Sequence, residues 1–388
     1  MSKPRIGIVL TELGIHSEIW AMRQIEHFER IEPVLFAWSA RHLDDVPPGT
    51  ETHLFRTPFA RPTTPLVRLG WKLGLPGAIL PPRAWIEDIR RTMLPTGLDA
   101  VLAHFAWNAM RLVPAVGDRL PIVAQVHGRD VSKFLANRAY RAAMARTLPH
   151  LHHVAAVGSC QIPEIAPLGL GDHSLIPCGA PFADFSGRPL PERAAGEDIR
   201  FVSVGRIAAE KGVMQTIEAF ERVAAAHPAA RWICVGAGDQ LDALRARAAR
   251  SPVADRIEIT GRVEEDEKRR LLATGHVFLQ HSRSIGGWIE GFGVSITEAG
   301  GSGLPIVATR IGGILDQVRE GENGFLHPEA DVEAQAAAML RLAEDETLRR
   351  TMGAAARRIA AEFDARTLSL KLEDRLLAAA SGRTAAAA

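Results

Sequence analysis

Cysteine is scarce in this chain, which has only Cys160, Cys178 and Cys234 among its 388 residues. They form no C-x-x-C pair and an odd number cannot pair completely, which argues against a disulfide framework and a structural zinc site and fits a reducing compartment. An Asp-x-Asp sequence and a His/Cys cluster at ligand spacing are missing as well. We therefore expect no metal site and no cofactor.

An excess of one charge is also missing, because Lys and Arg number 46 against 45 Asp and Glu. A general nucleic-acid binder needs a broad basic surface, so we expect no nucleic-acid partner. The longest nearly apolar run, Leu73–Pro82, is too short and too rich in Pro and Gly to span a bilayer. Ile6–Leu10 is soon followed by Glu12 and indicates a buried strand rather than a signal peptide. We expect a cytoplasmic protein, with attachment to the inner face of the membrane left open.

Apolar runs of strand type alternate with helical patterns in the first half of the chain. Thr11–Ser17 is a predicted loop, and Glu18–Glu29 has the apolar spacing of a helix. The strand-type runs are Arg5–Leu10, Pro33–Trp38, Asp99–His104 and Pro121–Val126. This alternation predicts a doubly wound parallel sheet, in which ligands bind at the carboxyl ends of the strands.

A second alternating set follows a polar stretch rich in Pro and Gly, Ser186–Asp198, which is typical of an interdomain linker. The length of the chain also favours two or three domains. Three helical patterns close the chain, at 331–344, 346–362 and 366–380. The strand-type runs of this half are Ile199–Val204, Arg231–Val235, Ile257–Ile259, His276–Gln280, Ile306–Ala308 and Gly324–Leu326.

Two carboxylates flank a glycine-rich segment in the stretch Glu290–Pro305, which reads EGFGVSITEAGGSGLP. If a helix begins near Val294, Glu298 projects from its second turn while Glu290 lies on the preceding loop. One carboxylate would then accept hydrogen bonds from sugar hydroxyls and the other from a ribose, with the amides between them facing a diphosphate. An ordinary loop with two solvated glutamates is the alternative.

Charged residues also follow predicted strands. Arg206 and Lys211 flank the loop after Ile199–Val204, and two cations with a helix N-terminus can hold a diphosphate without a metal. His127 follows the strand run that ends at Val126 and precedes a glycine, which is an active position in this fold class. The alternatives are solvated loop charges for the cations and a structural role for the histidine. Gly14 permits either close backbone approach to a ligand or a simple turn.

Motifs of other enzyme classes are missing. The chain has no G-x-x-x-x-G-K-[ST] and no G-x-S-x-G, which argues against a P-loop nucleotidase and a hydrolase with a nucleophile elbow. Gly236-Ala237-Gly238 begins like a dinucleotide fingerprint, but Leu241 occupies the position of its third glycine.

Five segments of the second half together resemble glycosyltransferase family 4, the retaining, nucleotide-sugar-dependent enzymes of the GT-B fold. They read VGRIAAEKG, ITGRV, EGFGVSITEAGGSGLPIVAT, IGGILDQV and ENGFL, and the resemblance is strong over Ile199–Leu326. In the first half, the HGxD segment at His127–Asp130, HFAW at His104–Trp107 and Leu13–Glu18 are similar to members that build bacterial exopolysaccharide or lipopolysaccharide.

The resemblance implies an α/β fold with two Rossmann-like domains facing across a cleft, at 1–187 with 366–388 and at 188–365. It implies a donor site in which Arg206 and Lys211 neutralise the diphosphate and Glu290 with the amides of Gly291–Gly293 holds the sugar. The residues implied to be catalytic are His127, Arg206, Lys211 and Glu290. Those implied to bind the donor are Gly14, Arg206, Lys211, Val263, Glu290, Gly291, Phe292, Gly293, Val294 and Glu298.

The implied partners are a nucleoside diphosphate sugar and a glycan or lipid-linked glycan acceptor, with a front-face displacement and no metal. Asp316 stands where the family commonly has Glu, Ala299-Gly300-Gly301 stands where it often has Ala-Met-Ala, and Gly14 alone replaces a glycine pair. A phosphorylase, an epimerase or a non-catalytic sugar-nucleotide or glycan-binding subunit remain alternatives.

One irregular stretch, Arg56–Met93, is basic and carries Trp71 and Trp85 among other apolar residues. Such a stretch can lie on an anionic membrane surface, so peripheral membrane association is one reading. The alternative is a pair of helices packed on the domain with a solvated basic face.

Overall fold

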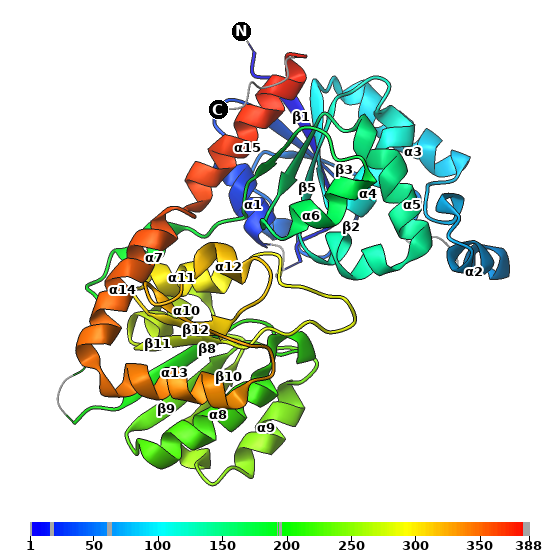
Figure 1. Cartoon of the computed structure of the whole chain (residues 1–388). Coiled ribbons are helices and arrows are strands. Elements are labelled where there is room, and N and C mark those ends of the chain that lie inside the picture. The colour runs from blue at the N-terminus through cyan, green and yellow to red at the C-terminus, as the bar shows by residue number, and fades with distance from the viewer. Residues whose placement is uncertain (1, 16–18, 60–63, 192, 194–195, 383–388) are drawn as a thin grey trace. The chain divides into compact units, whose positions relative to one another are not determined.

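The computed structural model describes residues 2–15, 19–59, 64–191, 193 and 196–382, and it divides the chain into two units (Figure 1). Unit 1 comprises Met1–Cys178 and Ala365–Ala388, and unit 2 comprises Gly179–Asp364. The first boundary therefore falls at Cys178 in the structure, earlier than the 187 expected from the sequence. Each unit contains one parallel sheet covered by helices.

Unit 1 is built on seven parallel strands in the order β3-β2-β1-β4-β5-β6-β7. The central strands are buried on both faces, which is why their sequences are continuous apolar runs. The strands are β1 (Arg5–Leu13), β2 (Glu32–Ala40), β3 (Glu51–Leu54), β4 (Ala100–His104), β5 (Ile122–Val126), β6 (His153–Ala156) and β7 (His173–Leu175). The helices are α1 (Ile19–Glu26), α2 (Pro65–Lys72), α3 (Arg83–Met93), α4 (Ala106–Val116), α5 (Arg138–Thr147), α6 (Gln161–Ile165) and α15 (Ala365–Ala380).

Two boundaries in this unit differ from the sequence-based expectation. Strand β1 continues to Leu13, which pairs with Ala40 of β2, so the expected loop does not begin at Thr11. Helix α1 ends at Glu26 rather than at Glu29, while Ser17 and Glu18 lie outside the described residues. The early end has a tertiary cause, because the backbone N–H of Glu29 donates to the Glu373 carboxylate at 2.7 Å instead of to a helix carbonyl.

The C-terminal helix α15 belongs to unit 1, where it lies beside α1 (Figure 1). Glu373 is fully buried and accepts hydrogen bonds from the backbone N–H and Nε of Arg30, at 2.6 and 2.8 Å. Leu368, Leu372 and Leu376 are buried on the same helix, as its leucine spacing predicts. A charged contact and an apolar stripe therefore both hold this helix in place.

The basic stretch Arg56–Met93 contains two helices with different surroundings. Helix α3 packs into the core through Trp85, Ile89 and Met93. Helix α2 begins at an N-cap, Thr64, and leaves its leucines in solvent, with Leu66 80% and Leu69 50% exposed. None of the helices in the described part of the chain has the length and apolar content needed to cross a membrane.

Unit 2 is built on six parallel strands in the order β10-β9-β8-β11-β12-β13. The strands are β8 (Ile199–Val204), β9 (Ala230–Val235), β10 (Ile257–Gly261), β11 (Val277–Gln280), β12 (Ile306–Thr309) and β13 (Gly324–His327). The helices are α7 (Phe182–Ser186), α8 (Val213–Ala226), α9 (Leu241–Ala249), α10 (Glu265–Ala273), α11 (Val294–Gly301), α12 (Ile314–Gln317), α13 (Val332–Glu344) and α14 (Glu346–Ala361). Every strand run predicted for this half is present, so the doubly wound α/β class is confirmed for both units.

Candidate functional site

The two cations predicted to act together line one pocket of unit 2. Arg206 follows β8, and Lys211 lies at the end of the same loop, just before α8. Gln280, the last residue of β11, and His281 after it line the same pocket. Because parallel strands present their carboxyl ends at one edge of the sheet, these groups meet although they are far apart in sequence. Arg206 also pairs with Glu210, with 2.7 Å between Nη1 and Oε1.

Glu290 is held by three donors at the same edge of the sheet. Lys211 forms an ion pair with its Oε2, and the same oxygen accepts from Ser282 Oγ at 2.8 Å and Gln280 Nε2 at 3.1 Å. The residue is only 5% exposed, so the alternative of a solvated glutamate does not apply. Within the described residues all three contacts end on Oε2 and none ends on Oε1.

Glu298 is also buried, but a different lysine holds it. Helix α11 begins at Val294 as predicted, and Glu298 in its second turn is 3% exposed. Its Oε1 lies 2.8 Å from Nζ of Lys268 on α10. Lys268 was not predicted to be a site residue, because the charged helix sequence around it is typical of a solvated surface.

The loop between the two carboxylates is only partly available to a ligand. The N–H of Gly293 donates to Gln317 Oε1 at 2.9 Å, so this amide, which was expected to hold the donor, is already engaged within the unit. The N–H groups of Gly291 and Phe292 have no such partner in the described ranges. Val294 and its neighbour Ser295 open helix α11, where backbone N–H groups have no intrahelical acceptor.

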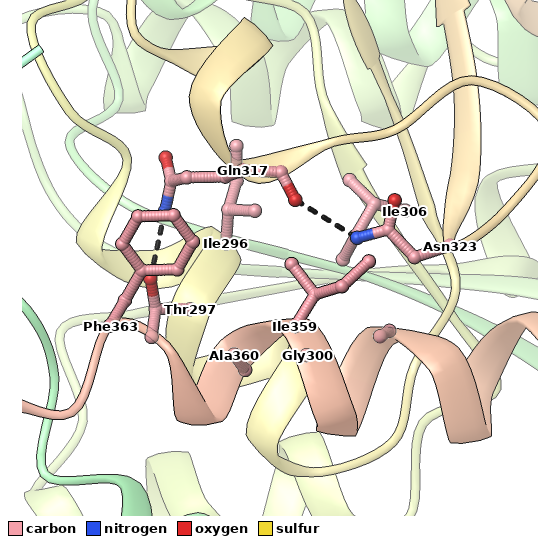
Figure 2. Close-up of a pocket in the computed structure, with 10 residues that line it drawn as sticks. Ile296, Thr297, Gly300, Ile306, Gln317, Asn323, Ile359, Ala360 and Phe363 are labelled. Carbon is pink, nitrogen blue, oxygen red and sulfur yellow. Dashed lines mark hydrogen bonds between the residues drawn. The ribbon is translucent and has the colours of Figure 1, made fainter.

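Gln317 and Gln280 connect this loop to the rest of unit 2. Gln317 Nε2 donates to the Gly293 carbonyl at 2.9 Å and to Thr297 Oγ1 at 2.7 Å, and Figure 2 shows the second of these contacts. Gln280 Oε1 accepts from Ser295 Oγ at 3.2 Å. Neither glutamine was predicted as a site residue. For Gln280 a signal existed, since it is a polar residue at the end of a buried strand.

In unit 1, His127 lies at the end of β5 within a buried cluster. Its Nε2 is 3.3 Å from His104 Nδ1, its Nδ1 is 3.6 Å from Cys178 Sγ, and its ring centroid is 4.2 Å from that of Trp20. Burial lowers the pKa of His127 well below its ordinary value, and the neighbouring His104 lowers it further. The imidazole is therefore neutral near pH 7.

The Asp of the HGxD segment explains the shape of this turn. Asp130 is fully buried, and its carboxylate accepts from the backbone N–H groups of His127, Gly128 and Ala106 at 3.0, 2.9 and 2.9 Å. These three contacts join the end of β5 to the start of α4. The motif thus positions His127 through its aspartate.

Two further predicted site residues have clear packing environments. Gly14 adopts a positive φ of 71°, and a Cβ there would lie 2.2 Å from the carbonyl oxygen of His42, so the turn requires glycine. The backbone of Gly14 thus lies close to the backbone of His42 in the same unit. Val263 follows β10 and packs half-buried beside Val235 and Leu271. Among the residues described, no three His, Cys, Asp or Glu side chains gather as a metal-ion cluster.

The two doubly wound units match those of GT-B enzymes. The structure of Anabaena Alr3699/HepE in complex with UDP superposes with a TM-score of 0.73 at 17% identity, covering 97% of this chain and 100% of that one. Residues 191–359 match the family model described as Glycosyl transferases group 1. This match covers less than half of the chain, and the fold of the chain is GT-B.

The chain is also similar to curated proteins that are named as glycosyltransferases. The chain is 28% identical over 188 residues to the phosphatidylinositol N-acetylglucosaminyltransferase gpi3 subunit of Schizosaccharomyces pombe, covering 48% of this chain but only 40% of that relative. It is 27% identical over 294 residues to the putative colanic acid biosynthesis glycosyltransferase WcaL of Salmonella typhimurium, covering 72% of this chain and 70% of that relative.

Proposed function

We propose that the protein is a retaining glycosyltransferase that moves a hexose-type sugar from a nucleoside diphosphate sugar to a glycan or lipid-linked glycan during synthesis of a cell-surface polysaccharide or glycolipid. The observation that carries this proposal is the ion pair of Lys211 and Glu290 beside the pocket that Arg206 lines. Cations suit the diphosphate of such a donor, and a carboxylate suits the hydroxyls of its sugar. The match of residues 191–359 to the family model and the relatives named for polysaccharide and glycolipid synthesis support the same activity.

The proposed chemistry places charge stabilisation on Arg206 and Lys211. The bond between the anomeric carbon and a diphosphate oxygen breaks, and the acceptor hydroxyl oxygen bonds to the same carbon on the same face. Negative charge develops on the leaving diphosphate, where the two cations and the N-terminus of α11 stabilise it. The acceptor proton passes to a diphosphate oxygen, so the step needs neither a metal nor a base from the protein.

The carboxylates have separate tasks in this scheme. Glu290 accepts hydrogen bonds from the sugar hydroxyls on Oε1. Its Oε2 is held by hydrogen bonds from Lys211, Ser282 and Gln280. Glu298 accepts the ribose hydroxyls, and Lys268 holds it in place. The backbone N–H groups of Gly291 and Phe292 donate hydrogen bonds to the donor sugar, and Val263 lies near the base of the nucleotide.

Residues of unit 1 also have proposed roles. We assign His127 to sugar binding as a neutral hydrogen-bonding group, because burial lowers its pKa well below the ordinary value. Gly14 shapes the turn after β1 through its contact with His42. The acceptor binds at the domain that carries these residues.

A donor screen followed by product analysis tests the activity. Purified protein is first screened by thermal shift against UDP-, GDP-, ADP- and dTDP-sugars and the free diphosphates, without added metal, because a ligand that binds the native state raises the midpoint. The donor that binds is then incubated with glycolipid extracted from membranes, and NMR reads the anomeric configuration of the product. We expect a new glycoside with the configuration of the donor.

The other outcomes of this experiment identify the alternatives. Sugar 1-phosphate formed from a glycan and inorganic phosphate would indicate a phosphorylase, and a changed donor sugar without acceptor would indicate an epimerase. Donor binding without turnover in the presence of native glycolipid would favour a non-catalytic binding subunit. Each of these results would overturn the transferase proposal.

Peripheral membrane association is part of the proposal, because a lipid-linked acceptor is presented at a membrane. Helix α2 supports it with the exposed side chains of Leu66 and Leu69 and the exposed basic residues Arg68 and Lys72. Apolar and basic groups exposed together suit an anionic lipid surface. A cytoplasmic protein bound to the inner face of the membrane follows from this proposal.

A further inference from the structure

Gln317, the last residue of α12, is a buried polar side chain that bonds to the loop carrying Glu290. It is 2% exposed, and its amide meets the backbone of Gly293 twice, as acceptor for the N–H and as donor to the carbonyl, both at 2.9 Å. Its third contact, to Thr297 Oγ1, reaches into the first turns of α11 (Figure 2). In the described part of the chain, all three hydrogen bonds of this side-chain amide are thus made to this segment.

Gln317 is itself held by a second buried amide. Asn323 is 2% exposed, and its Nδ2 donates to the backbone carbonyl of Gln317 at 2.9 Å, which Figure 2 also shows. Asn323 Oδ1 accepts from the backbone N–H of Arg319 at 2.7 Å. The contact with Asn323 therefore fixes the backbone of Gln317, and with it the position of the side chain, in the absence of a ligand.

The backbone before α12 contacts the other end of the same loop. The N–H of Gly313 donates to the Glu290 carbonyl at 2.9 Å, and a Cβ at Gly313 would lie 1.9 Å from the carbonyl oxygen of Gly291. Residues 312–317 therefore follow the loop from Glu290 to Gly293, with a backbone contact at one end and Gln317 at the other.

Helix α11 needs this contact because its own N-cap cannot supply one. Gly293 occupies the N-cap position and has no side chain with which to bind the first-turn amides. Its carbonyl accepts from the N–H groups of Ile296 and Thr297, at 2.9 and 3.3 Å, and from Gln317 Nε2 as well. The side chain of Gln317 fixes from another element the peptide from which α11 starts.

We propose that Gln317 is a positioning residue for sugar transfer, acting through Gly293 to set the direction of the Glu290 carboxylate and of the α11 N-terminus. This role rests on the proposed function. Without the amide, the N–H of Gly293 is buried without its acceptor and the Gly293 carbonyl keeps only its helical donors, so the loop moves to satisfy the N–H. A shift of about 1 Å at such a loop is enough to lower the rate by on the order of 100-fold.

Two substitutions of similar size separate positioning from packing. Gln317→Met keeps the volume and removes all three hydrogen bonds. Gln317→Glu still accepts from the Gly293 N–H, but it donates to the Gly293 carbonyl or to Thr297 Oγ1 only when it is protonated. Burial raises the pKa of the introduced carboxyl, so its protonated fraction grows as the pH is lowered.

The expected activities follow from this difference. Gln317→Met lowers kcat/KM by at least about 10-fold, the factor that corresponds to about 1.4 kcal/mol of lost transition-state stabilisation. Gln317→Glu is impaired at pH 8, and its kcat/KM relative to the unsubstituted protein rises as the pH falls to 6. A pH-independent ratio, or unchanged kcat/KM in Gln317→Met, overturns the proposal.

Hydrogen exchange gives a readout that needs no donor. In Gln317→Met the peptides covering 290–297 should exchange at least about 10-fold faster than in the unsubstituted protein, while the rest of unit 2 is unchanged. Gln161→Met is the matched control, because Gln161 is an equally buried amide that accepts from Val157 N–H at 3.0 Å in unit 1. It should leave exchange at 290–297 and the pH profile unchanged.

The two assays distinguish the failure of each proposal. One outcome is that Gln317→Met speeds exchange only at 290–297 while no protein, the unsubstituted one included, transfers sugar. This outcome would reject the transferase activity, but it would still show that Gln317 holds the loop in position. Faster exchange throughout unit 2 in Gln317→Met would mean that the residue serves stability alone, and the positioning role would be rejected.

Discussion

Lys211 forms an ion pair with Glu290 across 79 residues of sequence, and both side chains are largely withdrawn from water. The pair also lies beside an aromatic ring, since Lys211 Nζ is 5.5 Å from the centroid of Trp288. In the proposed reaction the lysine faces the diphosphate and the glutamate faces the sugar. Their ion pair therefore links the binding of the diphosphate to the binding of the sugar.

Lys211→Ala tests this coupling. The substitution removes the cation that stabilises the leaving diphosphate and one of three donors to Glu290, so we expect kcat/KM to fall by about 10²–10³-fold. The double variant Lys211→Ala/Glu290→Gln should be impaired far less than the product of the two single effects, because the residues act together. Steady-state kinetics with the identified donor measures both.

Arg222→Ala is the control for this series. Arg222 pairs with Glu333 on the surface of the same unit, at 2.7 Å and with both side chains exposed. Its removal should change kcat/KM by less than about twofold, since exposed ion pairs contribute little. A similar loss in Arg222→Ala and Lys211→Ala would mean that the kinetic effect is not specific to the site.

The pair of Glu298 and Lys268 separates stability from donor binding. Lys268→Met leaves a carboxylate buried without this cation, and we expect the free energy of unfolding to fall by about 3 kcal/mol. In Lys268→Met/Glu298→Gln the charge is removed as well, so most of this loss should be recovered. Denaturant titration measures both values.

Donor affinity should not recover in that double variant. Glu298→Gln replaces a charged acceptor for the ribose hydroxyls by a neutral amide, and we expect the donor KM to rise about 10-fold. Unchanged KM in both Glu298→Gln and the double variant would place Glu298 outside the donor site and leave it a purely structural role.

Acid should destabilise unit 2 through His327. This side chain is 3% exposed, and burial lowers its pKa to about 4, below the value near 6.5 of the unfolded chain. Since the folded pKa is the lower one, the stabilisation is present above about pH 6.5 and is lost as the pH falls towards 4. At pH 5 the loss amounts to about 2 kcal/mol.

His327→Leu should therefore reduce the loss of stability between pH 7.5 and pH 5, measured by denaturant titration at each pH. His173→Asn serves as the control, because His173 is exposed and its substitution should leave the pH dependence unchanged. Equal pH dependence in His327→Leu and the unsubstituted protein would contradict the assignment of this residue.

Charge reversal on α2 tests the membrane surface. Arg68→Glu/Lys72→Glu should weaken binding to vesicles that contain anionic lipid by about 10-fold or more at low salt, on the basis of about 1 kcal/mol per basic residue. The difference should shrink as salt screens the charges. Sedimentation with vesicles of phosphatidylcholine and phosphatidylserine measures it.

Arg245→Glu/Arg250→Glu is a matched control, since these residues are exposed on α9 and just after it in unit 2. The same change of net charge there should have a smaller effect. Leu66→Ser should weaken binding at all salt concentrations, because its contribution is apolar. Equal effects of the two charge reversals would point to net charge rather than to α2.

Helices and strands could be predicted wherever the signal was local. The run RIGIVL marks β1 because a strand covered on both faces needs apolar side chains at every position. The end of α1 could not be predicted, since Glu373, 344 residues away, binds the amide of Glu29. The exposure of Leu66 on α2 likewise depends on what the fold places beside it.

For the candidate site, the sequence by itself determined which chemical groups stand at the carboxyl ends of the strands, because short apolar runs and the glycines after them are read locally. Arg206, Lys211 and Glu290 could therefore be predicted as site residues from the sequence. Only the tertiary structure decided the partners, Lys268 for Glu298 and Gln317 for Gly293. Each of these contacts joins two different elements of unit 2. The strands lie in an order in space that differs from their order in the chain, and this spatial order determines which side chains meet.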